Sequence, residues 1–327
     1  MSSVSESGTK SPQRRKLASK PHLVQDKVFF GVARAAAVGA VGIVGLILAY
    51  LLFMSWDTLG KQGFDFILGS QWTAADPENM IFQIGPMLWG SLLIAFNGVV
   101  LAIPMAIAAA YFIEFLATKR IAKIATTVVD LLAAIPSIVI GLWGVGVFTP
   151  VAAHWAELLN TNLGFIPIFK NEAGSFVGSP FIAGWIVAVM IVPIITSVTR
   201  EIFSQLDRDV INAATALGAS RSSTFMRVIL PTSSGGIVGG VLLGLGRALG
   251  ETVAIFFVLN LSFEINWVDV IEGRGGSIAS MIVAFFGAAT PEEVKALIAA
   301  GLVLFVITLL INWLAAVIVA KAQPWRK

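Results

Sequence analysis

Long apolar stretches alternate with short charged segments along almost the whole chain of 327 residues. A helix that crosses the hydrocarbon layer of a membrane needs roughly 20 apolar residues, at about 1.5 Å of rise for each. Six stretches approach that length: Phe29–Met54, Ile81–Ile113, Ile124–Phe148, Phe181–Val198, Gly235–Leu259 and Val294–Val319. The pattern therefore predicts an all-α membrane protein with six transmembrane helices, whose two termini lie on the same side.

Composition agrees with this fold class and suggests three segments. Hydrophobic residues make up 57% of the chain and charged residues only 13%, which excludes an ordinary soluble domain. Residues 1–27 are rich in Ser, Lys and Pro, so we expect them to form a disordered basic tail. Residues 28–321 are expected to form the six-helix transmembrane domain, and residues 322–327 a short C-terminal tail.

Positive charges accumulate on one side of the predicted spans. Lys and Arg collect before the first span, between the second and third, between the fourth and fifth, and after the sixth, whereas the opposite loops carry mainly Asp and Glu. Cytoplasmic loops are enriched in Lys and Arg, so both termini are expected in the cytoplasm and the chain in a cytoplasmic membrane. The net charge of +3 then reflects orientation, and no nucleic-acid partner is expected.

Few residues offer metal or thiol chemistry. The chain has no Cys, which excludes disulfides and thiol nucleophiles, and its two His residues lack partners at metal-binding spacing. We therefore expect no metal site and no catalytic site in this chain.

A charged pair interrupts the fifth predicted span. An arginine at bilayer depth costs about 2.5 to 3.5 kcal/mol, so Arg247 is expected to face protein or water. Glu251 follows four residues later and would share its face on a continuous helix. The pair suits a path for an anion, with Arg247 binding and Glu251 competing, but a structural pair that fixes helix register remains open. Glu114, near the end of the second span, is interpreted as interfacial.

Glycines recur at a spacing of four along the same span. The sets are Gly235 and Gly239; Gly236, Gly240 and Gly244; and Gly246 and Gly250. Small residues on one helix face let another backbone approach closely. Packing inside this chain and packing against another subunit explain the spacing equally well.

The segment between the fourth and fifth spans, 203–231, predicts two short cytoplasmic helices. Asp207 is a plausible N-cap for a helix through Leu217, and Gly218 is a natural left-handed stop. A second helix should run from about Ser220 and end before Pro231, which would start the next span. Exposed Ala213, Ala214 and Leu217 would form a small apolar patch suited to a groove on a partner.

This segment resembles the coupling loop of ATP-binding-cassette import permeases. The family pattern is Glu-Ala-Ala, three residues, Gly, nine residues and Ile-x-Leu-Pro. The corresponding residues here are Asn212, Ala213, Ala214, Leu217, Gly218, Val228, Leu230 and Pro231. Asn212 replaces the acidic residue, which removes a charge from that position, and Val228 replaces isoleucine conservatively.

Two further segments narrow the resemblance. Pro136–Gly144 and Gly244–Thr252 are similar to the PstC-type permease subunits of phosphate importers, and the similarity extends from the first span to the last. It implies the type I importer permease fold and a role in ATP-driven phosphate import. The implied partners are a homologous PstA-type permease, a PstB-type ATPase dimer that binds ATP and Mg²⁺, and an extracytoplasmic PstS-type phosphate-binding protein. ATP hydrolysis would then take place on a separate subunit.

Several alternatives remain open. The same fold could move sulfate, molybdate or another solute, and a PstA-type sister subunit carries a phrase similar to Arg247–Thr252. An ion channel belongs to a different class and would conduct without an ATPase. A membrane enzyme is the third alternative, although no cluster of nucleophile, base and metal ligands is apparent within a span.

Overall fold

The computed structural model describes residues 24–74, 79–265 and 267–322. Most of the predicted disordered tail, residues 1–23, and residues 323–327 lie outside this range. The described chain divides into two units, one ending at Tyr50 and the other beginning at Leu51. The first contains the N-terminal part of helix α1 (Val24–Gln62), and nearly all side chains of residues 26–50 are exposed.

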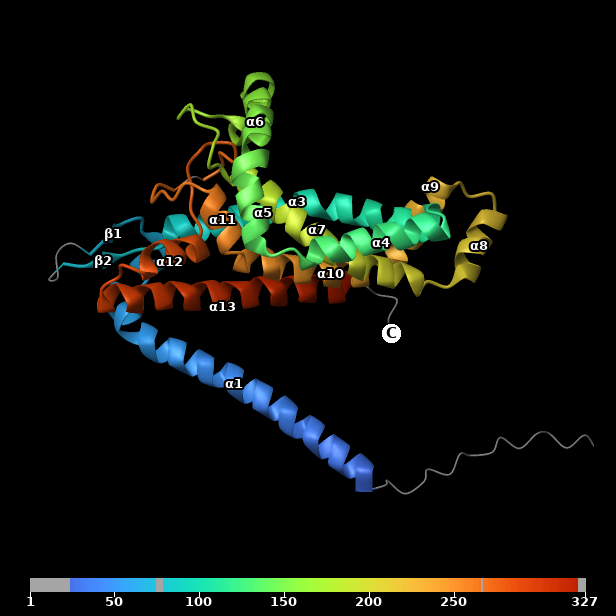
Figure 1. The fold of residues 1–327 in the computed structure, drawn as a ribbon, viewed down its shortest axis with the longest axis horizontal. Coiled ribbons are helices and arrows are strands. Elements are labelled where there is room, and N and C mark those ends of the chain that lie inside the picture. Colours follow the sequence, from blue (N-terminus) through green and yellow to red (C-terminus); the bar gives the residue numbers. More distant parts are fainter. Residues whose placement is uncertain (1–23, 75–78, 266, 323–327) are drawn as a thin grey trace, which may run out of the picture. The chain divides into compact units, whose positions relative to one another are not determined.

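Helices dominate the second unit (Figure 1). They are α2 (Asp65–Leu68), α3 (Gly85–Tyr111), α4 (Lys119–Ala134), α5 (Ser137–Trp143), α6 (Thr149–Leu163), α7 (Pro180–Ser204), α8 (Arg208–Ala216), α9 (Arg221–Thr224), α10 (Leu230–Gly250), α11 (Val253–Val258), α12 (Ile278–Phe286) and α13 (Pro291–Ala322). Short π-helical turns are η1 (Phe112–Leu116), η2 (Gly144–Phe148) and η4 (Phe225–Ile229), and η3 (Pro167–Phe169) is a 3₁₀ turn. Strands β1 (Trp72–Thr73) and β2 (Ile81–Phe82) pair antiparallel, with Trp72 opposite Phe82.

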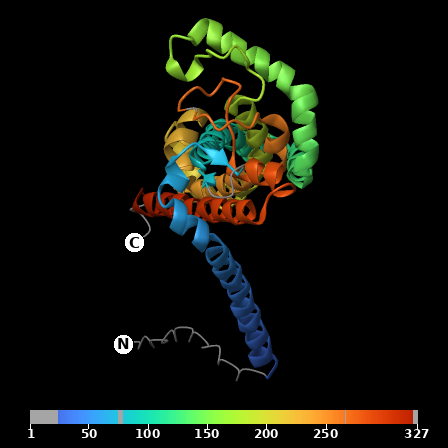
Figure 2. The same ribbon diagram turned by 90° about the vertical axis from the view of Figure 1, so that its left-hand side faces the viewer.

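Helices α3 and α7 form the centre of the bundle, and α10 and α13 run beside them (Figures 1 and 2). The most extensive packing joins α3 to α7, because small residues let the two backbones approach closely. A Cβ placed on Gly184 would lie only 2.7 Å from the Cβ of Asn97. Helices α8 and α9 lie at the end of the bundle opposite β1 and β2, and α6 extends away from the bundle in both views.

The structure contains six helical runs that are long and apolar enough to cross a membrane, which confirms the predicted number within the described residues. Four of the predicted spans correspond to continuous helices with shifted ends: 26–62, 85–116, 180–204 and 291–317. The second begins at Gly85 instead of Ile81, because Ile81 and Phe82 form β2 and Pro86 lies in the first turn of α3.

The prediction of one unbroken third span over Ile124–Phe148 is wrong. Helix α4 ends at Ala134, Ile135 is extended, and α5 begins after Pro136. Proline disfavours helical backbone in the preceding residue and has no N–H to continue the helix, so it breaks the run at this point. The continuous apolar run in this region is 137–163, which includes α6.

The fifth predicted span also has the wrong ends. Helical structure runs without interruption from Arg221 through η4 to Gly250, and the backbone of Glu251 is extended before α11 begins. The apolar pattern continues across this break, so it gave no signal of it.

Candidate functional site

Arg247 lies in the last turn of α10, and its side chain is exposed. Within 24–74, 79–265 and 267–322, no carboxylate lies within ion-pair distance of its guanidinium. Leu243, one turn earlier, is 61% exposed, and Gly239, one turn before that, is exposed as well. We call Gly239, Leu243 and Arg247 the open face of α10.

Glycines on a neighbouring stripe of α10 pack against α7. A Cβ on Gly240 would lie 3.1 Å from the Cβ of Val198, and one on Gly244 would lie 3.0 Å from the side chain of Ile195. Gly236 belongs to the same set and lies against Ile202. Packing inside this chain therefore accounts for Gly236, Gly240 and Gly244.

The other glycines of the helix have different surroundings. No described side chain would contact a Cβ on Gly239 or Gly250 within 4 Å, and Gly246 lies near Asn312 of α13, at 3.8 Å. Packing inside this chain therefore accounts for some of the glycines, and Gly239 and Gly250 are left without a described neighbour.

Glu251 does not share a helix face with Arg247, which corrects the expectation from sequence. Because α10 ends at Gly250, Glu251 adopts extended backbone with φ −71° and ψ 123°. Its buried side chain turns toward α11, where Oε1 accepts a hydrogen bond from the backbone N–H of Ala254 at 3.3 Å. Glu251 therefore caps the start of the next helix, and a structural ion pair with Arg247 is not formed in this chain.

The loop between α7 and α10 follows the predicted helix and glycine stop closely. The Asp207 side chain accepts a hydrogen bond from the N–H of Asp209 at 2.9 Å, and α8 starts at Arg208. Gly218 has φ +83°, and the N–H of Ala219 reaches back to the carbonyl of Ala214 at 3.1 Å. These caps confirm the predicted ends of the first helix.

The apolar patch of the loop is open to a partner. Leu217 is 89% exposed, Ala213 is exposed and Ala214 is half-buried. Asn212 is exposed beside them. Exposed apolar side chains on a short loop between polar residues form a candidate contact surface for a partner.

The second predicted helix does not end before Pro231. Helix α9, the π-turn η4 and α10 are continuous, and Leu230 and Pro231 lie in the first turn of α10. The wider π-turn precedes the proline and absorbs its missing N–H without a break. A single helix, about 39 Å long at 1.5 Å per residue, therefore joins Arg221 in the loop to Arg247.

An ion pair that sequence reasoning missed holds α8 to the end of α3. Arg208 Nη2 lies 2.6 Å from Glu114 Oε1, and the guanidinium lies 5.2 Å from the centroid of the Phe115 ring. The sequence indicates only that Glu114 is interfacial and identifies no partner for it. The available signal was Arg208 itself, because a cation at a helix N-terminus opposes the helix dipole.

A second set of charges lies within the loop between α11 and α12. Arg274 contacts Glu264 at 2.6 Å and the buried Glu272 at 2.5 Å, and these hydrogen bonds raise the pKa of its guanidinium. Burial, and then the neighbouring Glu272 carboxylate, raise the pKa of Asp269 in the same loop. Since both Arg274 contacts are carboxylates, its charge is already neutralised within the loop.

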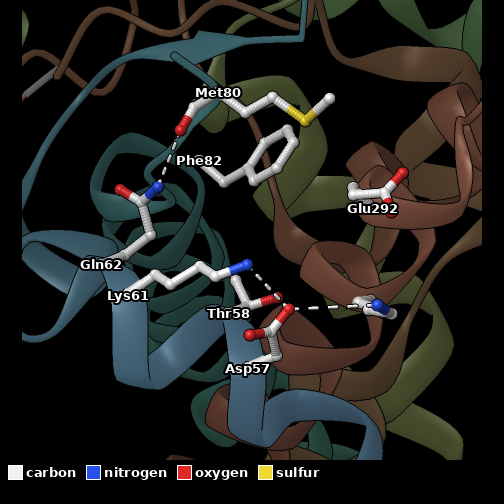
Figure 3. A pocket seen from close by; sticks show the side chains of 8 residues that line it. Asp57, Thr58, Lys61, Gln62, Met80, Phe82 and Glu292 are labelled. Atoms are coloured by element: carbon white, nitrogen blue, oxygen red, sulfur yellow. Dashed lines mark hydrogen bonds and ion pairs between the residues drawn. The ribbon is translucent and has the colours of Figure 1, made fainter. Parts of the chain in front are cut away.

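A pocket of about 240 Å³ lies at the opposite end of the bundle from α8 and α9 (Figure 3). It is lined by Asp57, Thr58, Lys61, Gln62, Met80, Phe82, Glu292 and Lys295. Lys61 Nζ lies 3.0 Å from Asp57 Oδ2, and Lys295 Nζ lies 3.9 Å from the same oxygen. None of the lining residues belongs to α10, so we do not assign this pocket to the path of Arg247.

Comparison with known proteins places these features in context. The family model of the binding-protein-dependent transport system inner membrane component matches residues 98–323. The phosphate transport system permease protein PstC 2 of Mycobacterium tuberculosis is 36% identical over 290 residues, which cover 88% of this chain and 89% of that protein. PstC of Haemophilus influenzae is 36% identical over 282 residues, 85% of this chain and 87% of that protein.

Solved structures show a similar fold. The crystal structure of a bacterial ABC transporter that imports alginate has a chain similar to 92% of this one, with a TM-score of 0.51 and 16% identity, and all of that chain is covered. A chain of the MetNI methionine ABC transporter covers 73% of this chain at a TM-score of 0.50 and 15% identity, with 94% of its own length matched. At these identities the likeness concerns the fold alone, which agrees with the expected importer permease architecture.

Proposed function

The chain belongs to the family of binding-protein-dependent transport system inner membrane components, and on this premise we propose that it is the PstC-type transmembrane subunit of an ATP-driven phosphate importer. The relatives named as phosphate permeases match it over most of their length, which supports phosphate over sulfate, molybdate or another solute. The same names support the PstC type over the PstA-type sister. In the proposed orientation both termini lie in the cytoplasm.

One observation supports a phosphate path at this place: Arg247, on the open face of α10, is exposed and unpaired. An arginine inside a membrane needs protein, water or an anion around it, and this chain supplies no carboxylate to it in the part that the structure describes. A guanidinium offers two parallel donors to phosphate oxygens, and it stays charged at any physiological pH. We assign to Arg247 the transient binding of phosphate during its passage.

Glu251 takes a different part in the path from the one expected from sequence. Its carboxylate holds the first turn of α11 and so keeps the break after Gly250 in place. The break ends α10 within one turn of Arg247, which leaves the guanidinium near the end of the helix. Glu251 is therefore assigned as a residue that positions the path.

The partners follow from the surfaces that this chain leaves open. A homologous PstA-type permease would cover the open face of α10, with the path for phosphate between the two chains. A PstB-type ATPase dimer would receive the patch around Leu217 and would bind ATP and Mg²⁺ in its own chains. A PstS-type binding protein would deliver phosphate to the outer loops.

Movement of the ATPase would reach Arg247 along one continuous helix. Gly218 separates α8 from α9, and from Arg221 onward the helix runs to Gly250 without a break. A helix transmits displacement along its axis because each turn is hydrogen-bonded to the next. A shift of the loop would thus change the position of the guanidinium that holds phosphate.

A competition assay tests the substrate and the transport class together. The chain is produced with its partner subunits in cells that lack their own high-affinity phosphate uptake, and entry of radiolabelled phosphate is followed with excess sulfate, molybdate or unlabelled phosphate. The proposal predicts uptake that needs ATP and that only unlabelled phosphate suppresses. Suppression by sulfate or molybdate would overturn the substrate assignment, and uptake without ATP would favour a channel.

A further inference from the structure

We propose that the Glu114–Arg208 ion pair is a second coupling link, which makes α3 follow the movement of the cytoplasmic loop. This inference rests on the proposed function, in which the loop receives the ATPase. The continuous helix from Arg221 to Gly250 already connects the loop to α10. The ion pair adds a separate connection, from the start of α8 to the end of α3.

The geometry of the pair joins two elements that are distant in the sequence. Arg208 is the first residue of α8, and Glu114 lies in η1, directly after α3. Their contact of 2.6 Å spans 94 positions of the chain. The side chain of Glu114 is only 19% exposed, whereas that of Arg208 is 55% exposed, so the carboxylate is fixed by the bundle and the arginine comes to it from the loop.

The location of Arg208 is unfavourable for α8 alone. A cation in the first turn faces the positive end of the helix dipole, where Asp or Glu would be stabilising. The helix dipole therefore does not stabilise an arginine at this place, and its ion-pair partner lies on another element. The cation–π contact with Phe115 holds the guanidinium in the same place.

The ion pair lies beside an aromatic cluster that is packed into the bundle. Phe115 lies 5.7 Å from the fully buried Phe203 of α7 and 5.3 Å from Tyr111 of α3, measured between ring centroids. Tyr111 in turn contacts Phe225 of η4 at 4.4 Å. A force on Arg208 is thus passed to rigid, packed side chains at the end of α3.

Helix α8 has few other attachments to the bundle. None of its residues, Arg208–Ala216, all of which the structure describes, is fully buried. Ile211 packs partly against the cluster that contains Phe203 and Ile229. Loss of the ion pair should therefore free the start of α8 from α3 while the covalent connection to α10 remains.

The chain contains no Cys, so single cysteines can report the movement of each helix in the complete complex. Phe96→Cys on α3 and Met226→Cys in η4, on the helix that continues into α10, replace side chains that are 66% and 58% exposed. Their reaction rates with a thiol reagent are compared with and without ATP and vanadate, which traps the ATPase. Each reporter is combined with Arg208→Gln, with Glu114→Gln, with the charge swap Arg208→Glu and Glu114→Arg, and with the control Arg120→Gln.

In the otherwise unchanged chain, both reporters should respond to ATP and vanadate. Arg208→Gln and Glu114→Gln should weaken the response on α3 about fivefold and keep that at position 226, and the charge swap should restore it. The contact of Tyr111 with Phe225 remains in these variants and accounts for the residual response. Inorganic phosphate transported per ATP hydrolysed should fall about fivefold in the two single variants, the factor that one partly exposed ion pair can contribute. Arg120→Gln should leave both quantities unchanged, since Arg120 is exposed and has no ion pair within the described residues.

An α3 response of unchanged size in Arg208→Gln and Glu114→Gln would overturn the link. So would a swap that fails to restore a response weakened in the single variants, because the two residues would then act separately. The reporters respond to ATP and not to phosphate. If the unchanged complex moves no phosphate, the proposed substrate fails while the reporters still decide on the link.

Discussion

Glu251 accepts a hydrogen bond from the backbone N–H of Ala254 and so faces the helix that follows it, not the arginine one turn before it. The carboxylate acts as a cap, and a neutral acceptor can replace it in that role. Glu251→Gln should therefore keep the break and most of the transport activity. Glu251→Ala should lower the stability of the complex by about 1 kcal/mol, the usual loss for a removed cap.

Two measurements on each variant, the melting temperature of the purified complex and phosphate uptake, distinguish a capping role of Glu251 from a role of its charge. If Glu251→Gln abolishes uptake while its melting temperature is unchanged, the charge itself belongs to the path and the capping role is insufficient.

The packed Gly240 and the uncovered Gly239 of α10 should respond differently to larger side chains. Gly240→Leu inserts a side chain where a Cβ alone would be 3.1 Å from Val198, and overpacking of this kind costs about 1 to 3 kcal/mol. Gly239→Leu adds the same atoms on the open face, where this chain makes no contact. Membrane levels of the chain should fall for Gly240→Leu and stay normal for Gly239→Leu.

Copurification completes this comparison. Gly239→Leu should lower recovery of the sister permease or block uptake, since the added side chain projects toward the proposed partner and path. Normal assembly and normal uptake in Gly239→Leu would argue that the open face of α10 faces lipid.

Leu217 is expected to insert into the ATPase. Leu217→Asp places a charge on a side chain that is already 89% exposed, so the fold of this chain should be unaffected. A buried charge at the interface would cost far more than the lost contact, so the ATPase should no longer copurify. Met226→Asp is the matched control, because Met226 is also exposed, at 58%, but lies outside the patch. Retention of the ATPase by Leu217→Asp would exclude the patch as its main contact.

The outer loop should lose stability as pH rises. The pKa of Asp269 is raised above its ordinary value of 3.8 by burial and by Glu272, so the folded loop favours the protonated carboxyl. The contribution of Asp269 to the stability of the folded loop is complete at pH values below its ordinary pKa. It is lost as pH rises through the raised pKa of the folded loop. Asp269→Asn should therefore stabilise the loop at pH 7 and have little effect below pH 3.8.

Hydrogen exchange at Val270 measures this effect. Its N–H donates to the carbonyl of Ile168 at 3.2 Å and so reports whether the two outer loops are closed. The Val270 N–H should exchange more slowly in Asp269→Asn than in the unchanged chain at pH 7. Faster exchange would contradict the predicted stabilisation of the loop.

Local signals in the sequence were sufficient for the cytoplasmic loop. Asp207 and Gly218 act through their own backbone and nearest neighbours, so their capping roles could be predicted without knowledge of the fold. The break after Gly250 could not be predicted in this way, because apolar residues continue on both sides and hydropathy does not distinguish one helix from two. The proline at 136 did carry a signal, since the residue before a proline is rarely helical.

The Glu114–Arg208 pair was beyond the reach of sequence patterns for a different reason. It depends on how the end of α3 and the start of α8 are brought together by α7, which is a property of the packed bundle. The sequence does show that Arg208 lies at an unfavourable position at the start of a helix, but this position does not indicate which residue is its partner. Pairings between distant elements of this kind require the fold.

The most direct test of the account is phosphate uptake by the complete complex with Arg247→Gln and with Arg247→Lys, at matched membrane levels. Glutamine removes the charge, and lysine keeps it but loses the paired donors. The account predicts that Arg247→Gln assembles with its partners and hydrolyses ATP but transports no phosphate, and that Arg247→Lys retains a small fraction of uptake. Normal uptake by an assembled Arg247→Gln complex would contradict the assignment of Arg247 to the phosphate path.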